Sequence, residues 1–144
     1  MLEIRLECCA LTPDEQSVVS AGFSRHSEEK GAPAFKKESL KWLAHEDEVL
    51  VGALTADLLW DWLYIDELWV REDLRGQGLG KKLMVAAEER AASLKLTGVW
   101  LWTQSWQAAE FYTALGYQEF TRFPDFPRGH SRIGFRKELA PELL

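Results

Sequence analysis

Residues 71–82 read Arg71-Glu72-Asp73-Leu74-Arg75-Gly76-Gln77-Gly78-Leu79-Gly80-Lys81-Lys82. Three glycines at alternate positions follow a strand-like segment and begin a helix-like one. Because glycine has no Cβ, such a backbone can wrap closely around a phosphate, and the unpaired N–H groups of the first helical turn point at it. The basic residues of this stretch add positive charge. It therefore predicts a strand, an anion-binding loop and a helix, in that order.

Two common phosphate-binding motifs do not fit these residues. The dinucleotide fingerprint G-x-G-x-x-G requires glycine at position 81, where the chain has Lys81. A P-loop, G-x-x-x-x-G-K-[ST], requires glycine at position 75 and serine or threonine at position 82, where the chain has Arg75 and Lys82. The spacing therefore favours a phosphate ligand of another class.

The segments around this loop predict a mixed α/β sheet. Before it, alternating apolar residues predict an antiparallel meander of three strands, at 39–46, 49–60 and 62–70. After it, helical spacing predicts a helix from Gly78 to Leu96. Further strands are predicted at 3–9, 99–103, 117–122 and 131–137. A helix is predicted from Thr12 to about Lys30, and another at 106–115. Gly116 is expected to end the second of these helices in a left-handed conformation.

Length and composition indicate one globular domain over residues 1–144. The chain has 47% hydrophobic and 28% charged residues, and its formal net charge is −6. This acidic balance argues against a general nucleic-acid binder. Charges interrupt every hydrophobic run, so we expect neither a membrane span nor a signal peptide.

The two cysteines, Cys8 and Cys9, are neighbours in the sequence. Adjacent side chains of a strand point to opposite faces, so a bridge between them would be strained. We expect two free thiols that are buried as small apolar residues. Free thiols in turn favour a reducing, cytoplasmic location.

The chain resembles the GNAT superfamily of N-acetyltransferases at three places. Residues 75–80 match its R/Q-x-x-G-x-G/A loop, and 108–117 resemble its A-x-x-F/L-Y-x-x-x-G-F/Y segment, with 32 residues between Gly80 and Tyr112. Residues 64–70 resemble its central strand. The resemblance covers about 62–122 and implies a mixed, mostly antiparallel central sheet flanked by helices, with splayed central strands. The implied activity is acetyl-CoA-dependent transfer to an amine.

The resemblance implies which residues bind acetyl-CoA. The backbone of Leu68, Trp69 and Val70 is expected to pair with the pantetheine arm. The pyrophosphate is expected in the loop, at Arg75, Gly76, Gln77, Gly78, Leu79, Gly80 and Lys81. Many members have an asparagine seven residues before the helix tyrosine. Here that position is Ser105, and Gln104 and Gln107 are alternatives for its contact.

Tyr112 is the expected proton donor to the departing thiolate, because the family's helix tyrosine is placed for that task. Its packing in an apolar helix stripe is the alternative interpretation. The general base is expected on the central strand, at Glu67 in preference to Asp66, and a position on a solvated face or sheet edge is the alternative interpretation of either residue. Adjacent strand residues face opposite ways, so we expect at most one of them to face the acceptor unless the strand is bulged.

Acidic residues and six of the seven tryptophans gather around the expected cleft. An aromatic face attracts a cation, so the acceptor is expected to be a small cationic amine or a peptide. No spacing suggests a metal site. The family often forms homodimers, which the resemblance allows here. The alternative function is a non-catalytic acyl-CoA-binding module on the same fold.

Overall fold

The structure is a computed structural model that describes residues 1–139. The chain divides into two compact units, Met1–Phe35 and Lys36–Leu144. Each unit is described by itself below.

The first unit contains helix α1 (Pro13–Glu29). The predicted helix starts at a capping box: the Thr12 Oγ1 accepts from the Glu15 N–H at 3.2 Å, and the Glu15 Oε1 accepts from the Thr12 N–H at 2.8 Å. The predicted strand at 3–9 is wrong, because residues 1–12 form no strand. Cys8 and Cys9 are free but exposed, so their predicted burial is also wrong. Apolar alternation alone does not make a strand, which requires a pairing partner.

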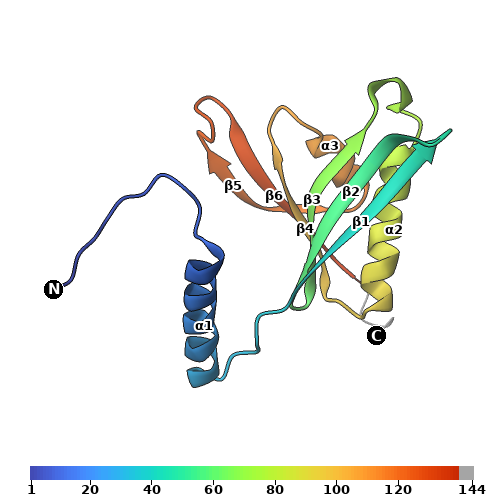
Figure 1. Cartoon of the computed structure of the whole chain (residues 1–144). Coiled ribbons are helices and arrows are strands. Elements are labelled where there is room, and N and C mark those ends of the chain that lie inside the picture. The colour runs from blue at the N-terminus through green and yellow to red at the C-terminus, as the bar shows by residue number, and fades with distance from the viewer. Residues whose placement is uncertain (140–144) are drawn as a thin grey trace. The chain divides into compact units, whose positions relative to one another are not determined.

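The second unit contains six strands in one sheet, in the order β1-β2-β3-β4-β6-β5 (Figure 1). The strands are β1 (Lys37–Glu46), β2 (Val49–Leu59), β3 (Trp62–Val70), β4 (Gly98–Gln104), β5 (Gln118–Pro124) and β6 (Ser131–Glu138). Neighbouring strands are antiparallel except β3 and β4, which are parallel. The predicted meander and mixed sheet are therefore confirmed.

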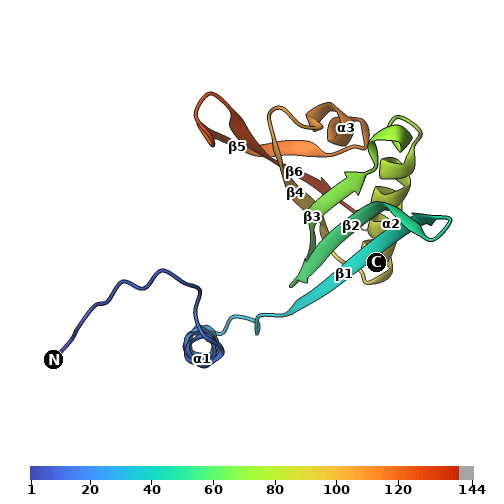
Figure 2. The same ribbon diagram turned by 45° about the horizontal axis from the view of Figure 1, so that its top comes forward.

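Helices α2 (Leu79–Ser93) and α3 (Ala109–Ala114) complete this unit, with a short 3-10 turn η1 (Glu72–Leu74) before α2. Both helices start and end within a few residues of the prediction. Gly116 has φ +94°, which confirms the left-handed end of α3. Figure 2 shows α3 beside the start of α2.

One face of the sheet packs on α2 to form the core. Leu83, Met84, Ala87 and Ala91 are the buried residues of α2. The largest fully buried side chains are Leu54, Leu63, Met84, Val99 and Leu101. Helix α2 begins directly after the glycine loop, so this packing fixes the loop against the sheet.

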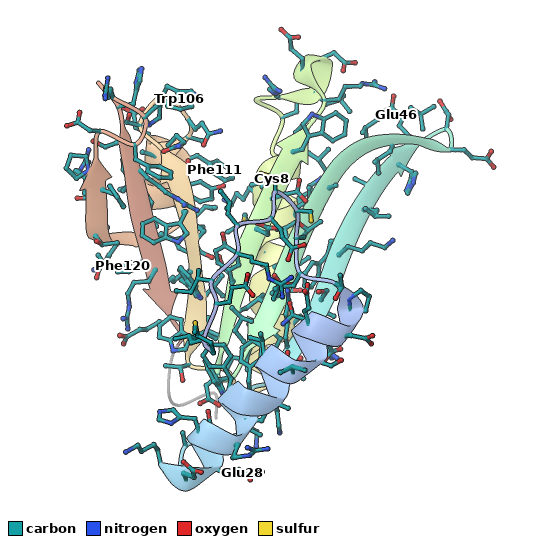
Figure 3. The ribbon with its side chains drawn as sticks, turned by 60° about the vertical axis from the view of Figure 1, so that its left-hand side comes forward. Cys8, Glu28, Glu46, Trp106, Phe111 and Phe120 are labelled. Carbon is teal, nitrogen blue, oxygen red and sulfur yellow. The ribbon has the colours of Figure 1, made fainter. Side chains whose placement is uncertain are left out.

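Strands β3 and β4 separate after a short paired segment. Their register runs from Trp62 opposite Gly98 only as far as Ile65 opposite Leu101. Beyond Ile65, β3 pairs with β2 alone, whereas β4 continues beside β6. Figure 3 shows the two halves of the sheet opening toward the end where Trp106 and Phe111 are labelled. The expected splay of the central strands is therefore confirmed.

Candidate active site

The glycine loop forms an open nest at the N-terminus of α2. Gly76 has φ +77° and Gly78 has φ +86°, and a Cβ at either position would meet no other atom within 4 Å. Gly78 is the N-cap of α2, and no side chain caps the helix. The N–H groups of the first turn therefore remain available to an anion, and the helix dipole favours negative charge there.

Of the basic residues in this loop, Arg71 is paired with a carboxylate of the described chain, whereas Arg75 and Lys81 are not paired with any carboxylate of residues 1–139. Arg71 forms a double contact with Asp73, with its Nη2 2.9 Å from Oδ2. This contact raises the pKa of Arg71 and lowers that of Asp73, and it neutralises the Arg71 charge. The Arg75 Nε donates to the Val70 carbonyl at 3.0 Å and so ties the loop to the end of β3. The positive charge facing an anion therefore comes from Arg75 and Lys81, which both line the groove described next.

A groove of about 880 Å³ runs from this nest along the splayed end of β3 to helix α3. The residues that line it are Leu68, Trp69, Val70, Leu74, Arg75, Gly76, Gly78, Leu79, Gly80, Lys81, Gln107, Ala108, Phe111 and Tyr112. Leu68 and Val70 also pack on the core. Since β4 does not pair with this part of β3, the backbone of β3 is open here to an extended ligand, which can pair with it in the manner of an added strand.

Three of the residues expected at the site do not line this groove: Glu67, Gln77 and Ser105. The Gln77 side chain donates to the Asp73 carbonyl at 3.2 Å and so stabilises the loop. The Ser105 Oγ accepts from the Ser131 N–H at 3.0 Å. Gln107, which the sequence offered as an alternative to Ser105, does line the groove, and its Oε1 accepts from the Gln104 N–H at 2.9 Å.

Tyr112 lies in the wall of the groove and is 8% exposed. Its ring packs against Tyr117 and Phe135, with ring centroids 6.1 Å away in each case. Within residues 1–139, its hydroxyl forms no hydrogen bond with another side chain or the backbone. Burial raises the pKa of Tyr112 above its ordinary value, so the hydroxyl keeps its proton. Tyr112 is thus both a packed aromatic residue and a protonated group facing the groove.

Glu67 and Asp66 line a second cavity, of about 310 Å³, between β1, β2 and β3. The register shifts by one residue here: Thr55 pairs with Glu67 and Ala56 with Ile65, which leaves Asp66 as the extra residue of a bulge. Both carboxylates line this acidic cavity, which is the bulged case that the sequence left open. Asp57 joins them, and Lys41 contributes a positive charge.

Two tryptophans of the sheet, Trp62 and Trp102, lie against arginines of the chain itself. The Arg132 guanidinium lies 4.7 Å from the Trp102 ring centroid, and that of Arg136 lies 4.6 Å from the Trp62 ring. Trp100 packs against Tyr64 with centroids 4.5 Å apart. The ring faces of Trp62 and Trp102 are therefore already in contact with cations of this chain.

None of the helices within residues 1–139 combines the length and apolar character needed to span a bilayer. The same residues contain no group of three or more His, Cys, Asp or Glu side chains placed to hold a metal ion.

Comparisons with known proteins agree with this geometry. The profile of the acetyltransferase (GNAT) family matches residues 6–117. Blasticidin-S acetyltransferase of Streptomyces morookaense is 38% identical over 91 residues, which cover 62% of this chain and 67% of that protein. An acetyltransferase from Bacillus cereus has a crystal structure that superposes with a TM-score of 0.79 at 27% identity, covering 93% of this chain and 98% of its own.

A second solved structure, of an acetyltransferase from Agrobacterium tumefaciens described as putative, has a TM-score of 0.83 at 24% identity. It covers 96% of this chain and all of its own, and it supports the fold. The family match spans most of the chain and includes both the nest and Tyr112. The chain therefore belongs to the acetyltransferase (GNAT) family, as an acyltransferase whose co-substrate is acetyl-CoA.

Proposed function

We propose that this enzyme transfers the acetyl group of acetyl-CoA directly to a primary amine of a small cationic molecule or a peptide, with both substrates bound together. One observation carries the proposal: the nest at Gly76–Lys81, the unpaired end of β3 and Tyr112 line a single groove. The three parts follow the order of groups along acetyl-CoA: the nest suits the diphosphate, the end of β3 suits the extended arm, and Tyr112 lies where the thioester would react.

The chain's own residues would hold the ligand in three places. The first-turn N–H groups of α2, with Arg75 and Lys81, would bind the diphosphate. The backbone of Leu68–Val70 would pair with the pantetheine arm, and Gln107, which lines the same groove, would offer a polar contact. When bound, acetyl-CoA supplies a thioester carbonyl that an amine can attack.

Tyr112 would act as the general acid. The hydroxyl carries its proton at neutral pH, which burial favours further by raising its pKa, and it can donate this proton to the departing thiolate. A phenylalanine would fill the same space without this proton. The matched substitution is therefore Tyr112→Phe.

Glu67 would act as the general base that removes a proton from the acceptor ammonium. The Thr55 hydroxyl donates to the Glu67 Oε1 at 3.0 Å, which orients the carboxylate. Glu67 and Leu68 are consecutive residues of β3, and they line the acidic cavity and the acetyl-CoA groove respectively. Asp57 and Asp66 would attract a cation into the same cavity.

One of the relatives described above is named for a small molecule, blasticidin S. Its name supports a small-molecule acceptor for this chain as well. The test is a product assay with acetyl-CoA and a panel of blasticidin S, polyamines, aminoglycosides, peptides and neutral alcohols. Mass spectrometry of an N-acetylated amine, at a rate that falls about a hundredfold in Tyr112→Phe, would support the proposal. Acetyl-CoA binding without product from any amine would contradict it.

Three further features belong to this proposal. A single domain over 1–144 is supported by a family match that runs through both compact units. The two free thiols fit the cytoplasm, and a homodimer follows from the family resemblance. Cell fractionation tests the location, and sedimentation of the purified chain tests the dimer.

A further inference from the structure

A polar network joins α2, the end of α3 and β6 on the core side of the sheet. The Tyr117 hydroxyl donates to the Glu88 Oε2 at 2.9 Å, and the Lys137 Nζ donates to the Glu88 Oε1 at 2.8 Å. The same Nζ donates to the Leu115 carbonyl at 2.9 Å. Glu88 thus holds two donors from parts of the chain that are far apart in sequence.

This network is largely withdrawn from water. Tyr117 is 2% exposed, and the side chains of Glu88 and Lys137 are 15% and 30% exposed. Hydrogen bonds to an ionised partner are stronger than neutral ones, and a partner left unpaired in such a place costs free energy. The three side chains therefore act as a unit rather than as a surface ion pair.

The network acts on the short helix that carries Tyr112. Helix α3 has six residues and no side-chain cap, and a helix of this length is not stable by itself. Its C-terminal end is held by the Tyr117 N–H, which donates to the Tyr112 carbonyl at 3.0 Å, and by Lys137 at the Leu115 carbonyl. A cation at a helix C-terminus is also favourable to the helix dipole.

Helix α2 connects this network to the glycine nest proposed to bind acetyl-CoA. Glu88 lies on α2, whose N-cap is Gly78 of the nest. A rigid helix therefore links the residues that would bind the diphosphate to the residue that anchors α3. The distance between the nest and Tyr112 depends on this anchor.

We propose that Glu88, Tyr117 and Lys137 are positioning residues for acetyl transfer, and that their network holds α3 so that the Tyr112 hydroxyl faces the thiol end of the groove. The inference rests on the proposed role of Tyr112 as general acid. None of the three lines the groove, so they would act through Tyr112.

The test uses two variants of the full chain. Tyr117→Phe keeps the buried ring and removes one hydrogen bond to Glu88. Glu88→Gln keeps the shape, but its amide can accept from one donor while its NH₂ group faces the other. Glu89→Gln, an exposed neighbour on the same helix, is the matched control.

Hydrogen exchange gives the readout that needs no acceptor. We expect the amides of 109–117 to exchange about tenfold faster in Tyr117→Phe and Glu88→Gln than in wild type, while those of 79–86 and of the control stay unchanged. Unchanged exchange at 109–117 in both variants would overturn the inference.

Kinetics with the fastest amine of the panel separate this inference from the proposed function. We expect kcat to fall about tenfold in Tyr117→Phe, with KM for acetyl-CoA unchanged, because misplacing a catalytic group costs rate. In a Tyr112→Phe background the second substitution should lower kcat no further. If Tyr112→Phe alone leaves kcat unchanged, the proposed role of Tyr112 fails. If it lowers kcat but Tyr117→Phe does not, or the two effects multiply, the positioning role fails.

Discussion

Phe111 lies over Gly80 of the nest: a Cβ built at Gly80 would lie 3.4 Å from the Phe111 Cζ. Gly80 belongs to α2 and Phe111 to α3, so a glycine at this position leaves room for the ring of the other helix. Tyr112 follows Phe111 directly, with the two rings 5.1 Å apart. The nest and the helix that carries Tyr112 are therefore close to each other at Gly80 and Phe111.

Gly78→Val is expected to abolish acetyl-CoA binding. Gly78 has φ +86°, which a branched side chain disfavours, and its Cβ would stand in the open space of the nest. Isothermal titration calorimetry with acetyl-CoA measures the loss. Gly31→Val is the control, since Gly31 has φ +71° with equally open surroundings but lies in the other unit. An unchanged affinity in Gly78→Val would show that the loop is not the binding site.

Arg75→Ala is expected to weaken acetyl-CoA binding by about tenfold, because it removes a charge from the nest and the bond to the Val70 carbonyl. Binding should also become less sensitive to salt, since one screened charge pair is lost. Titrations at low and high ionic strength measure both effects. Arg90→Ala, in the last turn of the same helix, should change neither. Equal salt dependence in Arg75→Ala and wild type would contradict the account.

Glu67→Gln is expected to lower kcat/KM for a cationic amine by about a hundredfold at neutral pH. The deficit should shrink as the pH approaches the pKa of the amine, because a growing share of the acceptor then arrives without its proton. Asp66→Asn, which alters only the local charge, should cost no more than about fivefold. The measurement is kcat/KM against pH for wild type, Glu67→Gln and Asp66→Asn. A larger loss in Asp66→Asn would assign the base to Asp66 instead.

Thermal stability is expected to fall as the pH rises above about 10, the ordinary pKa of tyrosine. Burial, with the Glu88 charge beside it, holds the pKa of Tyr117 far above that value, and burial also raises that of Tyr112. The unfolded chain then releases protons that the folded chain keeps, so stability present below this pH is lost above it. Melting curves should show a shallower decline in Tyr117→Phe. The same slope in both proteins would contradict the burial of this hydroxyl.

Local patterns predicted most of the second unit. The meander, the helix after the glycine loop and the turn at Gly116 follow from apolar spacing and glycine positions, and the structure has them within a few residues. The predicted strand at 3–9 failed because a strand depends on a partner, which local sequence does not specify.

The site was predictable only in part. The nest and Tyr112 belong to contiguous motifs and could be named from the sequence. The bulge at Asp66 depends on the pairing register with β2, which the sequence of β3 does not contain. The network of Glu88, Tyr117 and Lys137 joins residues up to 49 positions apart, and no motif marks it.

The most direct measurement is a crystal structure of the chain with acetyl-CoA. We expect the diphosphate on the main-chain amides between Gly76 and Lys81, the arm against the backbone of Leu68–Val70, and the sulfur within hydrogen-bonding reach of the Tyr112 hydroxyl. A diphosphate bound elsewhere, or a sulfur remote from Tyr112, would contradict the account.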